Sequence, residues 1–129
     1  MDDDSIEQEI QDKGLTAPRV TPADIEAEIA SEHCFTAHDG VMGTHESNGG
    51  VIAKMHPNTA ENGAHATEKL RLLTFCVLVL RNGFTVTGES ACVSPENFDA
   101  DIGRKIARQN AVAKIWPLLG FRLRDKLAG

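Results

Sequence analysis

The dipeptide Asn82-Gly83 constrains the fold of this chain more than any other feature of its sequence. Both residues tolerate positive φ, and such a pair between two apolar runs is the strongest short-range signal for a β-hairpin with a two-residue turn. The run before it, 70–80, is almost wholly apolar, and a second candidate strand, 84–93, follows it. Because a tight turn joins antiparallel strands, we do not expect a parallel βαβ architecture.

A two-residue turn also fixes the register of the hairpin and therefore its two faces. It predicts Val77 opposite Gly88. The predicted core face consists of Leu73, Phe75, Val77, Val79, Phe84 and Val86. The other face is half polar and half apolar, so another part of the protein or a second subunit is expected to pack on it. Leu78 and Leu80 lie on that face, and we expect them to form an interface with a second subunit.

Two pairs of a hydroxyl residue and a proline predict helix starts. Thr21-Pro22 opens a short helix that we expect to end near His33. Ser94-Pro95 opens the main helix, whose apolar residues recur at helical spacing as far as Trp116. Pro117 is expected to end this helix. The residues beyond it alternate apolar and basic, which predicts a short third strand or an extended tail.

The length of 129 residues suits one small domain, and we expect an acidic flexible tail before it. The tail is predicted at 1–18 and the domain at 19–129, with a long flexible loop at 42–68. The sequence leaves open whether this loop is disordered or a functional flap. The expected fold class is α+β. An antiparallel β-hairpin packs on one long α-helix, with a short N-terminal helix and a long middle loop.

Charge is spread unevenly along the chain, although the net value is −6. Residues 1–32 hold ten acids and two bases, whereas residues 102–129 hold seven bases and one acid. The basic end is either a solvated helix or a face for an anionic ligand. The overall acidity argues against duplex nucleic acid as a partner, because phosphate contacts supply most of that affinity. No apolar run is long enough to predict a membrane span, and the acidic N-terminus does not indicate a signal peptide.

The cysteines and histidines carry no recognised metal or catalytic spacing. Three cysteines without a CxxC pair are expected to be reduced thiols of a cytosolic protein. The five histidines lie in or next to the predicted loop and match no standard zinc site. A glycine-rich phosphate loop is also missing from the sequence. We therefore expect no catalytic residue, metal or cofactor.

The junction between the second strand and the main helix is unusually polar. Its residues have a structural explanation, in which Gly88 makes room for the helix and Ser94 caps it. The functional alternative is a small-ligand site whose arginines, spaced i, i+4, meet an anion and converge from two subunits. The ligand-binding candidates are Asn97, Arg104, Arg108, Thr87 and Glu89.

Two blocks of the sequence resemble a known family. They read RVTPADIEAEIASEHCFTAHDGV at 19–41 and LTFCVLVLRNGFTVTGESACVSPENFDADIGRKIARQNAVAKIWPL at 73–118. Both are similar to a family of small tailed-phage and prophage proteins. The family is named after gene product forty-nine of phage N-four and gene product sixty-six of phage Sf-six. At Cys34, relatives are expected to carry an aromatic residue. The resemblance implies a phage or prophage source and a protein made in the bacterial host.

From this resemblance and the charge pattern we expect a non-enzymatic accessory protein in the bacterial host cytosol. It would be a homo-oligomer that binds a small anionic ligand, in the most concrete version an immune nucleotide signal that it sequesters. The alternative is a protein-interaction module that inhibits a host factor through its acidic N-terminal segment, or a virion-assembly factor. A small metal-dependent hydrolase is a third hypothesis. Duplex nucleic acid and membranes are not expected partners.

Overall fold

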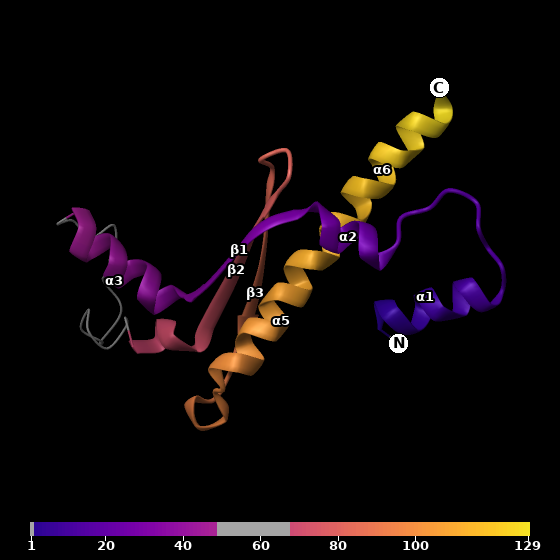
Figure 1. Ribbon diagram of the computed structural model, residues 1–129. Coiled ribbons are helices and arrows are strands. Elements are labelled where there is room, and N and C mark those ends of the chain that lie inside the picture. The colour runs from indigo at the N-terminus through magenta and orange to yellow at the C-terminus, as the bar shows by residue number, and fades with distance from the viewer. Residues whose placement is uncertain (1, 49–67) are drawn as a thin grey trace, which may run out of the picture.

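The computed structural model describes residues 2–48 and 68–129 and has the expected α+β fold. Three antiparallel strands form one sheet in the order β1-β2-β3, with β1 at Ile29–Thr36, β2 at Leu73–Leu80 and β3 at Thr85–Ala91. The helix α5 crosses one face of this sheet, and α6 continues from it and projects beyond the sheet (Figure 1). The helices are α1 (Asp3–Asp12), α2 (Pro22–Glu28), α3 (Ala37–Asn48), α5 (Ala100–Ala113) and α6 (Ile115–Ala128), with short 3-10 turns at Leu70–Leu72 and Pro95–Asn97.

The predicted hairpin forms, but its register differs from the prediction by one residue. The Leu80 N–H donates to the Phe84 carbonyl at 2.8 Å, and the Gly83 N–H donates to the Leu80 carbonyl at 2.9 Å. Gly83 alone in the turn has positive φ, at 89°. The turn therefore has three residues, a type I turn closed by a left-handed glycine. As a result Cys76, and not Val77, lies opposite Gly88.

The extra turn residue exchanges the two faces of β2. Leu78 and Leu80, the predicted interface residues, are 0% and 4% exposed and belong to the core of the protomer. That prediction is therefore wrong: α5 and α2 of the same chain cover this face, with Ile25 and Ala111 in contact with the cluster. The β2 residues predicted as core are only half-buried, on the face turned away from α5: Leu73, Phe75, Val77 and Val79.

The strand β1, which the sequence analysis does not predict, occupies the end of the predicted first helix. The capping box at Thr21 forms as expected, with the Asp24 N–H donating to Thr21 Oγ1 at 3.1 Å. The helix α2 nevertheless ends at Glu28, because the following residues pair with β2. This pairing places Cys34 opposite Cys76, and the two form a disulfide. The expectation of reduced thiols is wrong for this pair, whereas Cys92 is free.

The main helix α5 begins later than predicted and ends at Ala113, and a second helix, α6, follows it. Asp99, and not Ser94, caps α5, since Asp99 Oδ1 accepts a hydrogen bond from the Ile102 N–H at 3.0 Å. Pro117 does not end the helical region, and the predicted third strand or extended tail beyond it is the helix α6. Pro117 is tolerated because it lies in the first turn of α6, where backbone N–H groups have no partner within the helix.

Gly88 allows α5 to approach the sheet, as the sequence predicts. A Cβ atom on Gly88 would lie 2.2 Å from the Ala107 carbonyl oxygen and 2.3 Å from the Ala111 nitrogen. Both alanines are fully buried against the sheet. The small residues on both sides therefore set the distance between β3 and α5.

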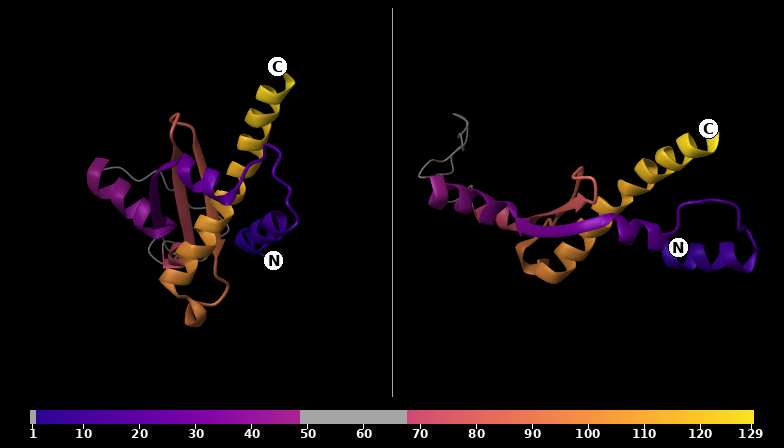
Figure 2. Two further views of the ribbon diagram at one scale, coloured as in Figure 1. Left: turned by 45° about the vertical axis from the view of Figure 1, so that its right-hand side comes forward. Right: turned by 45° about the horizontal axis from the view of Figure 1, so that its top comes forward.

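Helices are present where the sequence predicts a flexible tail and the start of a flexible loop. Residues of the predicted tail form the helix α1, which lies beyond α2, whereas α3 lies at the opposite end of the molecule (Figure 2). The helix α3 includes the first part of the predicted loop, and 49–67 lie outside the described residues. The division into tail, domain and loop stays a prediction. Among the described helices, none combines the length and apolar character that a membrane span requires.

Candidate functional site

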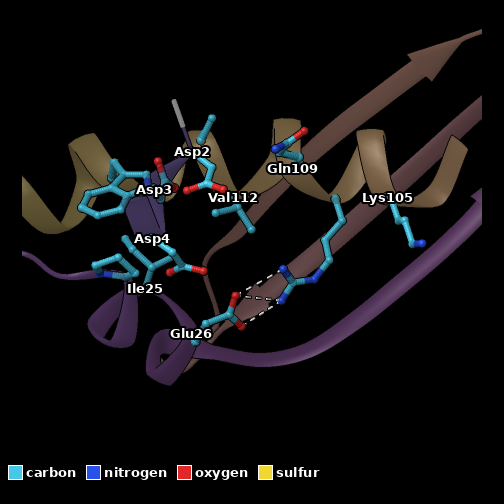
Figure 3. A pocket seen from close by; sticks show the side chains of 12 residues that line it. Asp2, Asp3, Asp4, Ile25, Glu26, Lys105, Gln109 and Val112 are labelled. Atoms are coloured by element: carbon cyan, nitrogen blue, oxygen red, sulfur yellow. Dashed lines mark hydrogen bonds and ion pairs between the residues drawn. The ribbon is translucent and has the colours of Figure 1, made fainter. Parts of the chain in front are cut away.

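A pocket of about 660 Å³ lies between the start of α1, α2 and the consecutive helices α5 and α6 (Figure 3). We call it the α1–α5 pocket. Its apolar lining comes from Pro22, Ile25, Val112, Ala113 and Trp116, and its polar lining from Asp2, Asp3, Asp4, Glu26, Lys105, Arg108 and Gln109. The pocket is therefore an apolar cleft with an acidic rim at one side and basic side chains at the other.

The acidic rim is held by the first turn of α1. Asp2 caps this helix, because Asp2 Oδ1 accepts a hydrogen bond from the Ser5 N–H at 2.7 Å. The same hydrogen bond lowers the pKa of Asp2 below its ordinary value, because it stabilises the ionised carboxylate. Asp3 Oδ2 accepts a hydrogen bond from Trp116 Nε1 at 3.1 Å. The rim thus joins the N-terminal segment to the only tryptophan of the chain.

Arg108 sits across the pocket from this rim, but two carboxylates already bind it. Arg108 Nη2 lies 2.9 Å from Glu26 Oε2, and the same nitrogen lies 2.6 Å from Glu32 Oε1. The hydrogen bonds that Arg108 donates to Glu32 and then to Glu26 raise the pKa of Arg108 above its ordinary value. One guanidinium between two carboxylates leaves a net negative charge. Arg108 therefore ties α5 to α2 and β1 and does not offer a vacant site for an anion.

The ligand-binding residues predicted from the sequence are not gathered into one site. Arg108 lines the α1–α5 pocket, whereas Arg104 is half-exposed and lies 3.8 Å from Asp101 on its own helix. Thr87 and Glu89 are exposed on β3, on the sheet face turned away from α5. Asn97 is exposed in the 3-10 turn before α5. Their spacing along the sequence could not show that the sheet separates them.

An ion pair between Arg19 and Glu7, neither of which lines the pocket, holds α1 in position. Arg19 binds Glu7 with both terminal nitrogens, at 2.5 Å and 2.7 Å. The hydrogen bond from Arg19, followed by one from Gln11, lowers the pKa of Glu7 to about 2. Because Arg19 precedes α2, this pair connects α1 to the body of the protein and keeps the acidic rim beside Trp116.

The pKa of Glu7 predicts how the docking of α1 depends on pH. The folded-state pKa of about 2 lies below the ordinary value of 4.5, so the stabilisation is complete above pH 4.5 and is lost as the pH falls toward 2. We expect the fluorescence of Trp116 to change over this acid range as α1 detaches. Glu7→Gln removes the titrating group, and an unchanged acid transition in that variant would contradict the assignment.

The face of the sheet turned away from α5 is a second feature of interest. We call it the open face. The central strand β2 contributes Leu73, Phe75, Val77 and Val79 to it, and the outer strands contribute Phe35 and His33 from β1 and Glu89 from β3. The rings of Phe35 and Phe75 lie 6.1 Å apart. Phe35 is 40% exposed, so this apolar surface is only partly covered by the described residues.

Comparison with known proteins gave one family. The sequence model described as "Phage protein (N4 Gp49/phage Sf6 gene 66) family" matches residues 20–127 of the chain. No curated protein and no solved structure matched. The family match covers α2 to α6 and leaves α1, with the acidic rim, outside.

Proposed function

We propose a function from the premise that this chain belongs to the phage protein family of N4 Gp49 and phage Sf6 gene 66. The family alone assigns no reaction, so the function has to be argued from the site. The proposal is a phage accessory protein that acts in the bacterial host cytosol by binding a partner and not by catalysis. The α1–α5 pocket is the proposed place of binding.

The acidic rim beside Trp116 is the observation that carries the proposal. Three consecutive carboxylates, Asp2 to Asp4, border a cleft whose floor includes an indole ring and aliphatic side chains. Lysine and arginine side chains are attracted by carboxylates and by the face of an indole, and their alkyl stems suit an apolar floor. The favoured partner is therefore a protein with a basic segment, and the acidic N-terminal segment is the recognition element. An inhibitor of a host factor and a virion-assembly factor differ only in which protein supplies that segment.

The hypothesis of a sequestered nucleotide signal receives less support at this pocket. Its candidate residues lie apart, and Arg108 is already paired with two carboxylates. An anion entering the α1–α5 pocket would also meet the acidic rim, which repels it. Between the two binding hypotheses, the geometry of this pocket favours the protein partner.

A titration with a short peptide rich in lysine and leucine tests the proposal, with Trp116 fluorescence as the signal. We expect saturable binding that weakens at least ~10-fold, or ~1.4 kcal/mol, when Asp2, Asp3 and Asp4 are changed to asparagine. The matched control neutralises three exposed acids elsewhere, by Glu68→Gln, Glu96→Gln and Asp125→Asn. Deleting residues 1–18 is expected to abolish binding. Equal weakening by the two triple variants, or equal binding of an acidic peptide, would refute the proposal.

Self-association is the second part of the proposal, and the open face is its proposed surface. The centre of this face is apolar, and its ionisable side chains, His33 and Glu89, lie on the two outer strands. A two-fold axis parallel to the strands places β1 of one copy over β3 of the other. This arrangement brings the imidazole of His33, a hydrogen-bond donor, toward the carboxylate of Glu89 at both edges of the contact and supports a second copy of the chain as the occupant.

A further inference from the structure

A second pocket, of about 260 Å³, lies between α2, α6 and the turn that joins β2 to β3. We call it the α2–α6 pocket. It is separate from the acidic rim, and its basic lining comes from three parts of the chain. The lining residues used below are Arg19, Arg81, Arg122, Lys126, Asp24 and Glu28.

Two of these residues have partners outside the pocket lining. Arg19 is bound on two nitrogens by Glu7, which lies on α1. Asp24 accepts a hydrogen bond from the Thr21 N–H at 2.9 Å and closes the capping box of α2. The bond to Asp24 comes from a neutral N–H and leaves its charge in place, so three cations, Arg81, Arg122 and Lys126, face the two carboxylates of Asp24 and Glu28. The pocket therefore has more positive than negative charge.

Glu28 interacts electrostatically with all three of these cations. Arg122 donates to Glu28 Oε1 at 2.8 Å and to Oε2 at 3.2 Å. The Glu28 side chain is only 12% exposed. The pKa of Glu28 is lowered first by the Arg122 hydrogen bonds and then by the charges of Arg122, Arg81 and Lys126. Glu28 is thus paired directly with only one of the three cations, Arg122.

The other two cations are positioned without a carboxylate partner of their own. Arg81 is fixed at the end of β2, where its backbone N–H donates to the Glu28 carbonyl at 2.9 Å and its Nε donates to the Ala27 carbonyl. Its two terminal nitrogens form no salt bridge with a described residue. Lys126 lies in the last turn of α6 and likewise forms no salt bridge in the described part of the chain. Both therefore have donors to offer to a ligand.

We propose that the α2–α6 pocket binds an anion of the phosphate class, held by Arg81 and Lys126 beside the Arg122–Glu28 pair. Guanidinium groups match phosphate oxygens with two parallel hydrogen bonds, and a lysine adds a point charge. The volume of about 260 Å³ is below the usual range for drug-sized ligands, so the pocket suits a phosphate or pyrophosphate group and not a whole nucleotide. The remaining wall is apolar, from Val20, Leu119 and Leu123, and would contact the organic part of a phosphate ester. This inference is independent of the proposed protein partner.

Calorimetric titration with inorganic pyrophosphate tests the inference. The variant Arg81→Gln/Lys126→Gln removes both proposed ligands and leaves the Arg122–Glu28 pair, which holds α6 to α2, intact. The matched control, Lys114→Gln/Arg124→Gln, removes the same charge from two exposed residues next to or on α6 that do not line the pocket. We expect saturable binding to the parent, at least ~10-fold weaker binding to the first variant and an unchanged affinity in the control.

Two results would overturn the inference: no saturable heat with millimolar pyrophosphate at ~0.15 M salt, or equal weakening by the two double variants. The same titration is repeated with inorganic phosphate and with phenyl phosphate. Tighter binding of phenyl phosphate assigns the pocket to a phosphate ester, and equal binding assigns it to a free anion. The lysine-leucine peptide titration should be unaffected by Arg81→Gln/Lys126→Gln. Failure of the phosphate site is therefore distinguishable from failure of the α1–α5 pocket.

Discussion

Changing Gly88 to alanine is expected to lower the free energy of unfolding by about 3 kcal/mol or more. The added Cβ would lie 2.2 Å from the Ala107 oxygen, 2.3 Å from the Ala111 nitrogen and 2.8 Å from the Asn110 carbonyl carbon. All three are backbone atoms of α5, so no side-chain rotation relieves the clash. The helix has to move away from β3 as a unit, which opens the contact around two fully buried alanines.

Urea denaturation followed by circular dichroism measures this effect, and Gly120→Ala is its matched control. A Cβ on Gly120 meets no atom within 4 Å, and the residue lies inside α6. Alanine is favoured over glycine in a helix interior by up to ~1 kcal/mol, so the control should be neutral or more stable. A Gly88→Ala protein as stable as the parent would show that α5 does not pack on β3 at this distance.

The hairpin shows what the sequence can and cannot predict. Asn82-Gly83 locates the turn correctly, and Val86 and Gly88 face α5 as expected. The predicted register was wrong because the same dipeptide also suits a three-residue turn in which only Gly83 has positive φ. The pattern of apolar residues along β2 could not distinguish the two-residue turn from the three-residue turn. This central strand is apolar on both faces, with Val77 on one and Leu78 on the other.

The first strand could not be predicted because its partner is distant in the sequence. The capping box at Thr21 marks the start of α2, and the glutamates that follow suit a helix equally well beyond Glu28. Pairing with β2 decides against the longer helix, as tertiary contacts commonly outweigh local propensity. The disulfide between Cys34 and Cys76 was missed for the same reason, since it needs both strands.

The candidate site was partly visible in the sequence. The acidic N-terminal segment was identified as a possible recognition element, and the structure places its carboxylates at the rim of a pocket. The i, i+4 spacing of Arg104 and Arg108 correctly places both on α5, but their partners could not be inferred. Glu26 and Glu32 reach Arg108 only because α2 and β1 pack beside α5. Charge patterns along a chain therefore locate surfaces better than they locate ion pairs.

Changing Leu78 to glutamate is expected to unfold the protein, whereas Val77→Glu should leave it folded. Leu78 is fully buried in the cluster with Ile25, Ala111 and Ile115. Removing a buried leucine alone costs ~2–5 kcal/mol, and an unpaired buried carboxylate adds several more. Val77 is the adjacent residue on β2 and lies on the open face. The same substitution one residue away therefore reports directly which face of β2 is the core.

Circular dichroism measures whether each variant is folded, and sedimentation equilibrium measures its oligomeric state. A folded Leu78→Glu protein, or an unfolded Val77→Glu protein, would contradict the observed register and favour the two-residue turn. If the open face joins two copies, Val77→Glu should also convert an oligomer into a folded monomer, because it places a carboxylate in the apolar centre of the contact. A parent protein that already sediments at 13.9 kDa would remove the self-association proposal. It would leave the assignment of the faces intact, because the core position of Leu78 depends on α5 of the same chain.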